Sequence, residues 1–253
     1  MSTHCVAWPR NRSVTVRLLA ALALLAVGCG DDSHRLGGAR DQLGLCAEGA
    51  VFESIDRMED GDGTTERVAE RSGYWFAFND DEFDTGPGTQ IPNPDDKTME
   101  TFPMSELDPP RGRSSHFAAR TYGGGFTDWG AGIGLELYTQ QTYDLSKYAG
   151  VTFWARRAPN TAATLRFSLP DTATSKRGGQ CEMCDDHFGS DLTLTTRFHR
   201  YSFTWQELKQ VPFGEPRPDA LNTKEVYGLR FQVHELQDFD FWIDDVAFIC
   251  NTD

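Results

Sequence analysis

The chain has 253 residues, of which 38 are Asp or Glu and 24 are Lys or Arg, so its formal net charge is −14. Nucleic-acid backbones carry a dense negative charge, so we expect no nucleic-acid partner. The length is sufficient for one large domain with a substantial hydrophobic core.

The first 28 residues have the features of an export signal. Three arginines precede an apolar stretch, 18–27, which at about ten residues is too short to span a bilayer. The sequence Leu-Ala-Val-Gly-Cys at 25–29 resembles the lipobox of bacterial lipoproteins. This resemblance implies cleavage before Cys29 and lipidation of Cys29. The alternative is a soluble secreted protein whose signal ends near a cysteine.

Processing at this position defines the predicted mature protein. It has 21 basic and 38 acidic residues, because the leader holds three arginines and no acid, and its net charge is therefore −17. Gly30 favours the outer membrane, since Asp at this position favours inner-membrane retention in familiar lipoproteins. No second apolar stretch is long enough to cross a membrane, so we expect attachment to the cell envelope through the lipid alone. Residues 29–48 read as a polar, Gly-rich tether and 49–253 as the folded domain.

Four cysteines remain for disulfides after Cys5 is removed and Cys29 is lipidated, and they allow three pairings. If the first and last strands are neighbours, a Cys46–Cys250 bond closes a loop of about 200 residues and stabilises the fold by several kcal/mol. The remaining pair is then Cys181–Cys184. A zinc site made of this pair and His187 is the alternative, and a local disulfide is favoured in an oxidising compartment.

The apolar pattern beyond the tether has a period near two, which predicts strands. The clearest predicted strands are 151–156, 164–169 and 228–234, and the weaker ones are 117–121, 133–138, 201–205 and 239–248. No segment keeps a helical period over three turns, so the pattern predicts an all-β sandwich. Two long predicted loops, 79–113 and 171–191, interrupt it, and loops of this length are usually functional or partly disordered.

Alternation along the three clearest strands separates a core face from an outer face. If these strands share one sheet, its outer face carries an aromatic ring beside planar hydrogen-bonding groups. Such a face suits a sugar, whose apolar ring face stacks while its hydroxyls pair with donors and acceptors. An ordinary solvated face is the alternative. The candidate residues on this face are Trp154, Arg156, Arg166, Arg230, Gln232 and His234.

Three blocks of sequence resemble carbohydrate-binding domains of the galactose-binding-like β-sandwich superfamily, near the family 11 modules. The blocks are 56–62 with 71–76, then 143–154, and finally 241–246, and the resemblance spans about residues 50–250. It implies a jelly-roll sandwich with a ligand groove on its concave sheet. Trp75 and Trp129 join Trp154 as candidate groove aromatics, and the 171–191 loop, with Asp171 and His187, is expected to wall the groove.

The same resemblance suggests a structural Ca²⁺ where the first and last strands approach each other. Its candidate ligands are Glu59 and Asp245, with Asp60 and Asp244 as neighbours, since calcium prefers carboxylate and carbonyl oxygens. Acidic residues that merely flank strand ends are the alternative interpretation.

These observations predict a monomeric, non-catalytic, lipid-anchored protein that binds a polysaccharide or other glycan. The first alternative is a structural or protein-interaction protein of the envelope, with the 79–113 loop as its contact surface. The second alternative is a glycan hydrolase or lyase, since the many acidic residues leave room for a catalytic pair of carboxylates.

Overall fold

The computed structural model describes residues 44–81, 86–94 and 102–251. All of them belong to one compact unit, Ala39–Asp253. The predicted export signal, the predicted lipidation site Cys29 and most of the predicted tether lie outside the described residues. Within the described part of the chain, no helix is long and apolar enough to cross a membrane.

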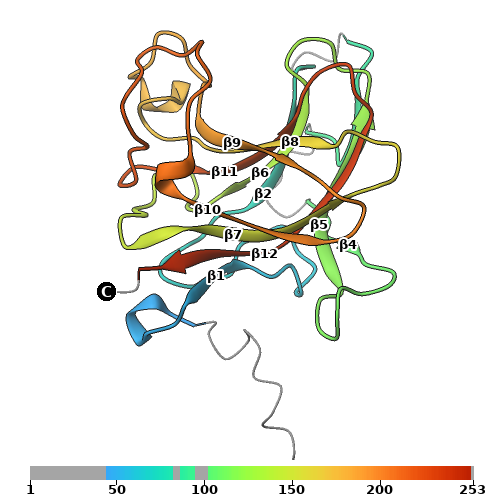
Figure 1. Cartoon of the computed structure of the whole chain (residues 1–253), viewed down its shortest axis with the longest axis horizontal. Helices are drawn as coiled ribbons and strands as arrows, with labels where there is room; N and C mark the ends of the chain where they lie inside the picture. Colours follow the sequence, from blue (N-terminus) through green and yellow to red (C-terminus); the bar gives the residue numbers. More distant parts are fainter. Residues whose placement is uncertain (1–43, 82–85, 95–101, 252–253) are drawn as a thin grey trace, which may run out of the picture. The chain divides into compact units, whose positions relative to one another are not determined.

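The described unit consists of two antiparallel sheets packed face to face, and its helical segments are single 3₁₀ turns (Figure 1). The strands are β1 (Phe52–Asp56), β2 (Trp75–Asn79), β3 (Thr89–Ile91), β4 (Ser105–Glu106), β5 (Phe117–Gly124), β6 (Ala131–Glu136), β7 (Tyr148–Arg157), β8 (Thr164–Leu169), β9 (Phe188–Thr193), β10 (His199–Thr204), β11 (Gly228–Val233) and β12 (Phe239–Cys250). The short turns are η2 (Cys46–Glu48), η3 (Lys176–Gly178) and η4 (Trp205–Glu207).

The strand order confirms the predicted jelly-roll β-sandwich. The seven-stranded sheet has the order β10-β7-β12-β5-β3, with β1 paired to β12 and β4 paired to β5, and the five-stranded sheet has the order β2-β6-β11-β8-β9. From β5 onward the chain crosses repeatedly from one sheet to the other, as jelly-roll connections do. All pairs of neighbouring strands are antiparallel.

The core lies between the sheets and consists of the side chains that alternation assigns to the inner faces. Phe153 of β7 packs against Phe167 of β8 and Phe231 of β11, with ring centroids 5.2 and 5.0 Å apart. All three are fully buried, together with Val151, Ala155, Leu165, Leu169, Leu229 and Val233. The predicted inward faces of these three strands are therefore confirmed.

Both expected disulfides are present. β1 pairs with β12, which brings Cys46 to Cys250 across a sequence separation of 204 residues. Cys181 and Cys184 form the second bond, within the loop after β8.

The two predicted loops hold more regular structure than the sequence indicated. The 79–113 segment contains β3 and β4, which both pair with β5 at the edge of the seven-stranded sheet. β9 begins at Phe188, inside the predicted 171–191 loop, and pairs with β8. Runs as short as β4 carry too few residues for alternation to be visible.

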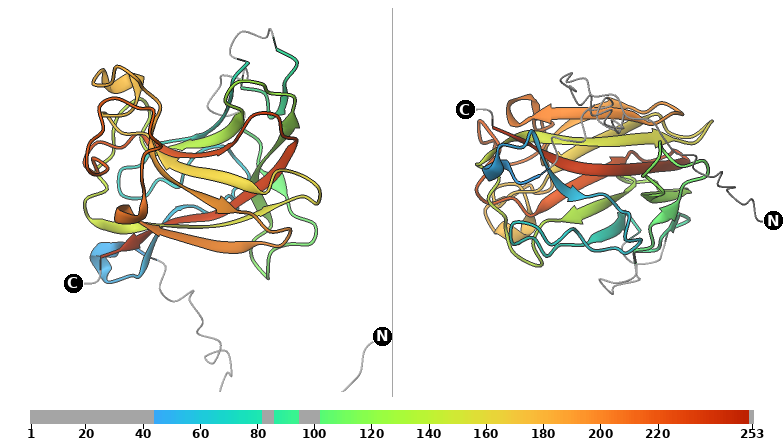
Figure 2. Two further views of the ribbon diagram at one scale, coloured as in Figure 1. Left: turned by 45° about the horizontal axis from the view of Figure 1, so that its top comes forward. Right: turned by 90° about the horizontal axis from the view of Figure 1, so that it is seen from below.

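Two groups of loops rise beyond opposite ends of the five-stranded sheet, on its outer side (Figure 2, left). One group contains η3 and the connection from β10 to β11. The other contains β3 and the described residues next to it, 86–88 and 92–94. Between them, the outer face of the five-stranded sheet forms the base of the site described next.

Candidate functional site

A cavity of about 1060 Å³ lies on the outer face of the five-stranded sheet, and we refer to it as the groove. Its floor comes from β2, β8 and β11. One wall is formed by residues 88–91, 93–94 and 128–129, and the other by residues 176, 184–187, 211 and 213. The floor residues are Phe78, Arg166, Ser168, Arg230 and Gln232.

Glycines in β6 let an aromatic ring lie flat on the floor. Phe78 pairs across the sheet with Gly132, and a Cβ atom at Gly132 would lie 2.8 Å from Phe78 Cζ. The ring of Phe78 therefore covers the glycine instead of standing away from the sheet. Trp129 stacks against Phe78 with ring centroids 6.0 Å apart and an interplanar angle of 26°. The two rings form an apolar platform at this end of the groove.

Backbone contacts hold Trp129 in place. Asp80 Oδ2 accepts hydrogen bonds from the backbone N–H groups of residues 128, 129 and 130, at 2.7 to 2.9 Å. Gln232 Nε2 donates to the Trp129 carbonyl oxygen at 2.8 Å. The indole is 39% exposed despite these anchors. An exposed aromatic ring on a fixed backbone loses little conformational entropy when a ligand stacks on it.

Arg166 connects the floor to the opposite wall. Its guanidinium donates to the carbonyl oxygens of His187 and Lys209 at 3.3 and 2.9 Å, and forms an ion pair with Asp191 at 3.2 Å. Arg166 therefore both lines the groove and holds the wall loops against β8.

His187 is buried in the same wall and is neutral. Its Nδ1 lies 2.9 Å from Thr174 Oγ1, whose own proton goes to Asp171 Oδ1 at 2.7 Å. The threonine hydroxyl therefore accepts from Nδ1–H, which leaves Nε2 as an acceptor. Burial lowers the pKa of His187 well below its usual value, and the charges of Arg230 and Arg166 lower it further.

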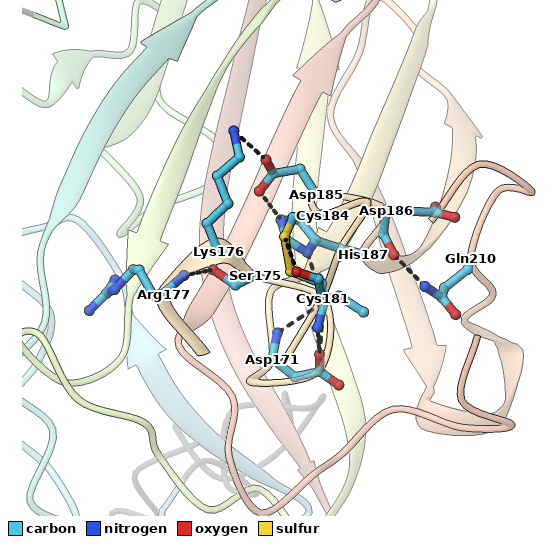
Figure 3. The surroundings of a disulfide bond; sticks show 11 residues. Asp171, Ser175, Lys176, Arg177, Cys181, Cys184, Asp185, Asp186, His187 and Gln210 are labelled. Carbon is cyan, nitrogen blue, oxygen red and sulfur yellow. Dashed lines mark hydrogen bonds and ion pairs between the residues drawn. A yellow bond between two sulfur atoms is a disulfide. The ribbon is translucent and has the colours of Figure 1, made fainter. Parts of the chain in front are cut away.

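The loop that carries this histidine is held rigid by its own contacts (Figure 3). Asp171 is fully buried and accepts from the backbone N–H groups of Thr174 and Asn222 at 2.9 and 3.0 Å. The Cys181–Cys184 bond and an ion pair between Lys176 and Asp185, at 3.3 Å, lie in the same loop (Figure 3). Asp171 supports the wall from behind, so its predicted role as a sugar contact is corrected.

Trp154 and Arg156 do not lie in the groove. β7 belongs to the seven-stranded sheet, so these residues lie on the far side of the sandwich from Gln232 and Arg230. The guanidinium of Arg111 lies 4.7 Å from the ring centroid of Trp154, and that of Arg156 lies 3.8 Å from the ring centroid of Trp242. The expectation that all three clear strands share a sheet is wrong for β7.

The prediction that Trp75 lies in the groove is also wrong. It is a core residue, 2% exposed, and its Nε1–H donates to Asp56 Oδ2 at 2.7 Å. Neighbouring residues of a strand point to opposite faces. Trp75 therefore enters the core, whereas Phe76 and Phe78 point to the outer face.

The structure thus places six of the ten predicted sugar contacts in the groove and the other four elsewhere. The six that line the groove are Trp129, Arg166, His187, Arg230, Gln232 and His234. Lining residues that the sequence analysis missed include Phe78, Ile91, Lys176, Val211 and Phe213. Phe78 carried a usable signal, since aromatic residues recur with period two in 75–79, but most of the others lie on loops without a periodic pattern.

The proposed calcium ligands make other contacts. Arg111 forms ion pairs with both Asp244, at 2.7 Å, and Asp245. Glu59 accepts from the backbone N–H groups of residues 116 and 117, and Asp60 accepts a long bond from the N–H of residue 62. Among the described residues, no cluster of three or more His, Cys, Asp or Glu side chains could hold a metal ion.

These contacts do not fit calcium, because a guanidinium bridges the two carboxylates that would face the ion. Burial raises the pKa of Asp244 to about 6 although Arg111 donates to it. Calcium binding stays a prediction from the sequence resemblance.

No protein-family model matches the chain, and no curated protein is significantly similar to it in sequence. Several solved structures are similar in fold. A family 11 carbohydrate-binding module from Clostridium thermocellum, in complex with a β-1,3-1,4-mixed-linked tetrasaccharide, has a TM-score of 0.49 and 13% identity, over 76% of this chain and 98% of that one. A family 11 module of a cellulosomal cellulase from the same organism has a TM-score of 0.48 and 12% identity, over 80% and 96%.

The K1 cleaved adhesin domain of Lys-gingipain from Porphyromonas gingivalis is also similar, with a TM-score of 0.41 and 13% identity over 79% of this chain and 98% of that one. Carbohydrate-binding modules recur among these structures. At these identities the likeness concerns the fold alone.

Proposed function

We propose that this domain binds a glycan in the groove without catalysing a reaction on it. The observation that carries the proposal is the pairing, within one open cavity, of the Phe78–Trp129 platform with fixed polar groups. A sugar ring has an apolar face that stacks on such a platform and hydroxyls that need donors and acceptors. Gln232 and Arg230 offer those groups beside the rings.

The dimensions of the groove suit an extended chain of sugars. Pockets for small ligands usually occupy about 300–1,000 Å³, and the groove reaches the upper end of this range and is open to solvent. The walls at either end are tied down by Asp80 and by Asp171, so the site needs little rearrangement to admit a ligand.

Affinity gel electrophoresis against a panel of polysaccharides tests this proposal. We expect retardation by at least one glycan, and Trp129→Ala weakens the binding about 10-fold, which corresponds to about 1.4 kcal/mol. Trp154→Ala is the matched control, because it removes a tryptophan from the other sheet. Absence of retardation by every glycan contradicts the proposal, and so does equal loss in the two variants.

We further propose that the protein acts as a monomer, held in the cell envelope by lipid on Cys29. The support is the lipobox-like sequence at 25–29. Metabolic labelling with an alkyne fatty acid tests it: the wild-type protein acquires the label, and Cys29→Ser does not. Equal labelling of both proteins contradicts the proposed anchor.

A protein-binding role is the second candidate, because apolar side chains lie exposed along the rim of the groove. Ile91, Val211 and Phe213 are 50%, 38% and 47% exposed. Crosslinking in intact cells distinguishes the roles: a specific protein partner that is lost when residues 85–110 are deleted favours protein binding. Release of reducing ends during incubation with a bound glycan would instead reveal a hydrolase or lyase.

A further inference from the structure

Arg230 is a cation on the groove floor without a partner among the described residues. It lies on β11 between Ser168 and Gly134 of the neighbouring strands, at the centre of the five-stranded sheet. Its Nε is buried and makes no hydrogen bond, and no carboxylate in the described ranges lies within ion-pair distance of its guanidinium. Its one described ring contact is with Phe78, whose centroid lies 5.2 Å away.

The other cations around the groove are compensated, which makes Arg230 different. Arg166 pairs with Asp191 and Lys176 with Asp185. Asp185 and Glu136 attract Arg230 at longer range, but Asp185 pairs with Lys176, and Glu136 forms its own ion pair with Arg177. Arginine keeps its proton in proteins, so this guanidinium stays charged. An uncompensated charge that is partly removed from water is unfavourable unless a ligand supplies the counter-charge.

A second unpartnered polar atom lines the same cavity. His187 Nε2 is buried, makes no hydrogen bond and, given the donation from Nδ1–H to Thr174, carries a lone pair. The nearest carboxylate oxygen, of Asp185, lies 3.7 Å from it, beyond hydrogen-bond distance. The groove therefore presents an unused cationic donor at Arg230, and the unused acceptor of His187 is buried within the wall beside it.

We propose that the groove selects acidic glycans, with the guanidinium of Arg230 pairing to a carboxylate or sulfate of the saccharide. This inference rests on the proposed glycan binding and names its ligand class. A guanidinium matches a carboxylate with two parallel N–H donors, a stronger interaction than a neutral hydroxyl offers. The Phe78–Trp129 platform stacks on the ring that carries the acidic group or on its neighbour.

The acidity of the whole chain does not prevent such binding. At physiological ionic strength, charges more than about 8 Å apart in solvent are largely screened, whereas close pairs in partly buried sites are screened much less. Of the groove acids, Asp128 is exposed to solvent and Glu235 is partly exposed. Asp186 is buried and satisfied by the N–H groups of Val211 and Gly214.

The test compares acidic polysaccharides with their carboxyl-reduced neutral forms. Polygalacturonate, alginate and hyaluronan, each beside its reduced counterpart, are titrated into the mature chain in the presence of a chelator, and a panel of neutral glucans is run in parallel. We expect at least one acidic polymer to bind about 10-fold more tightly than its reduced form. Arg230→Gln abolishes this preference, and Arg197→Gln, which removes an exposed arginine outside the groove, leaves it intact.

Thermal unfolding of the variants separates a loss of binding from a loss of structure. Because Arg230 has no described counter-ion, we expect Arg230→Gln to melt no lower than the wild type. Neutral glycans binding as tightly as acidic ones, or an acidic preference that survives Arg230→Gln, overturns this inference while glycan binding stands. Absence of binding to every acidic and neutral polymer overturns both.

Discussion

Asp56, at the end of β1, is a buried carboxylate that connects the first strand to the core. It accepts hydrogen bonds from the backbone N–H of Met58 at 2.8 Å and from the indole of Trp75 at 2.7 Å. Burial raises its pKa to about 7 despite these donors, and the charges of Asp60 and Glu66 contribute to the increase. Ionised Asp56 therefore opposes folding near neutral pH.

The free energy of unfolding is expected to depend on pH through this residue. The pKa is higher in the folded protein than the unfolded value of about 3.9, so the folded state binds more protons between these two values. The stabilisation by protonated Asp56 is complete below about pH 4 and is lost as the pH rises through about 7. Its share of the slope is at most about 1.4 kcal/mol per pH unit.

Denaturant unfolding at pH 5 and pH 8 measures this effect. Asp56→Ala lowers stability overall, because it leaves two buried donors unpaired, but it also reduces the difference between the two pH values. A difference that is as large in Asp56→Ala as in the wild type would show that the pH dependence comes from other groups.

Single residues in the floor and walls of the groove differ in whether their polar atoms are satisfied. Arg230 and His187 leave polar atoms unused, whereas Arg166 and Asp171 use theirs to hold the walls. Unsatisfied polar atoms are rare in protein interiors, and each needs an explanation. For Arg230, the explanation that we propose is an acidic ligand.

At the scale of elements, the close pairing of β2, β6 and β11 determines the shape of the floor. A Cβ atom at Gly132 would lie 2.2 Å from the Phe231 carbonyl oxygen and 2.8 Å from Phe78 Cζ. We expect Gly132→Ala to destabilise the domain by about 1–3 kcal/mol, as overpacking does, and to displace the Phe78 ring from the floor.

This change should weaken glycan binding more than it weakens the fold. Binding and unfolding are measured on Gly132→Ala and on Gly150→Ala, a control in the seven-stranded sheet where a Cβ would also meet a backbone oxygen, of Phe203, at 2.1 Å. Equal losses of affinity at equal losses of stability would indicate that Gly132 has no specific role in the groove.

Alternation predicts which side of a strand is buried, but not which sheet the strand joins. Val151 and Leu165 are core residues, as the period of two indicates, because burial depends on local sequence. Trp154 and Gln232 were expected on one face because their strands read alike. Sheet membership depends on pairings between strands far apart in the chain, such as β7 with β12, and a single sequence carries no signal for them.

The groove walls were predictable only in part. The 171–191 loop was expected to form a wall because of its length, and residues 176 and 184–187 do so. Val211 and Phe213 lie in a stretch without periodicity, and their position follows from contacts such as the bond from the Val211 N–H to Asp186. Trp75 was assigned to the groove from the family resemblance, and β2, whose alternation would have placed it in the core, was not recognised as a strand.

At the scale of the whole molecule, the Cys46–Cys250 bond joins the two ends of the described fold. It links η2 to the end of β12 and closes a loop of 204 residues. In the chain-entropy account a bond across so long a loop stabilises by about 4–5 kcal/mol, because it restricts the unfolded chain. The Cys181–Cys184 bond spans three residues and restricts it far less.

Removal of the two bonds should therefore have different consequences. Cys46→Ser with Cys250→Ser is expected to lower the free energy of unfolding by about 2–5 kcal/mol. Cys181→Ser with Cys184→Ser leaves stability nearly unchanged and loosens the wall that carries His187, so that glycan affinity falls. Guanidinium unfolding and glycan titration on both double variants check this, and equal loss of stability in the two would contradict the account.

The central claim is that a glycan occupies the outer face of the five-stranded sheet, and chemical-shift mapping by NMR tests it most directly. The isotope-labelled mature chain is titrated with the glycan that retards it in gels. We predict that amide signals of β2, β8, β11 and the Trp129 loop shift, and that the Trp129 indole signal shifts with them. The amide signals of β7 and the Trp154 indole signal are expected to stay in place. Shifts confined to the seven-stranded sheet, or to no surface, would contradict it.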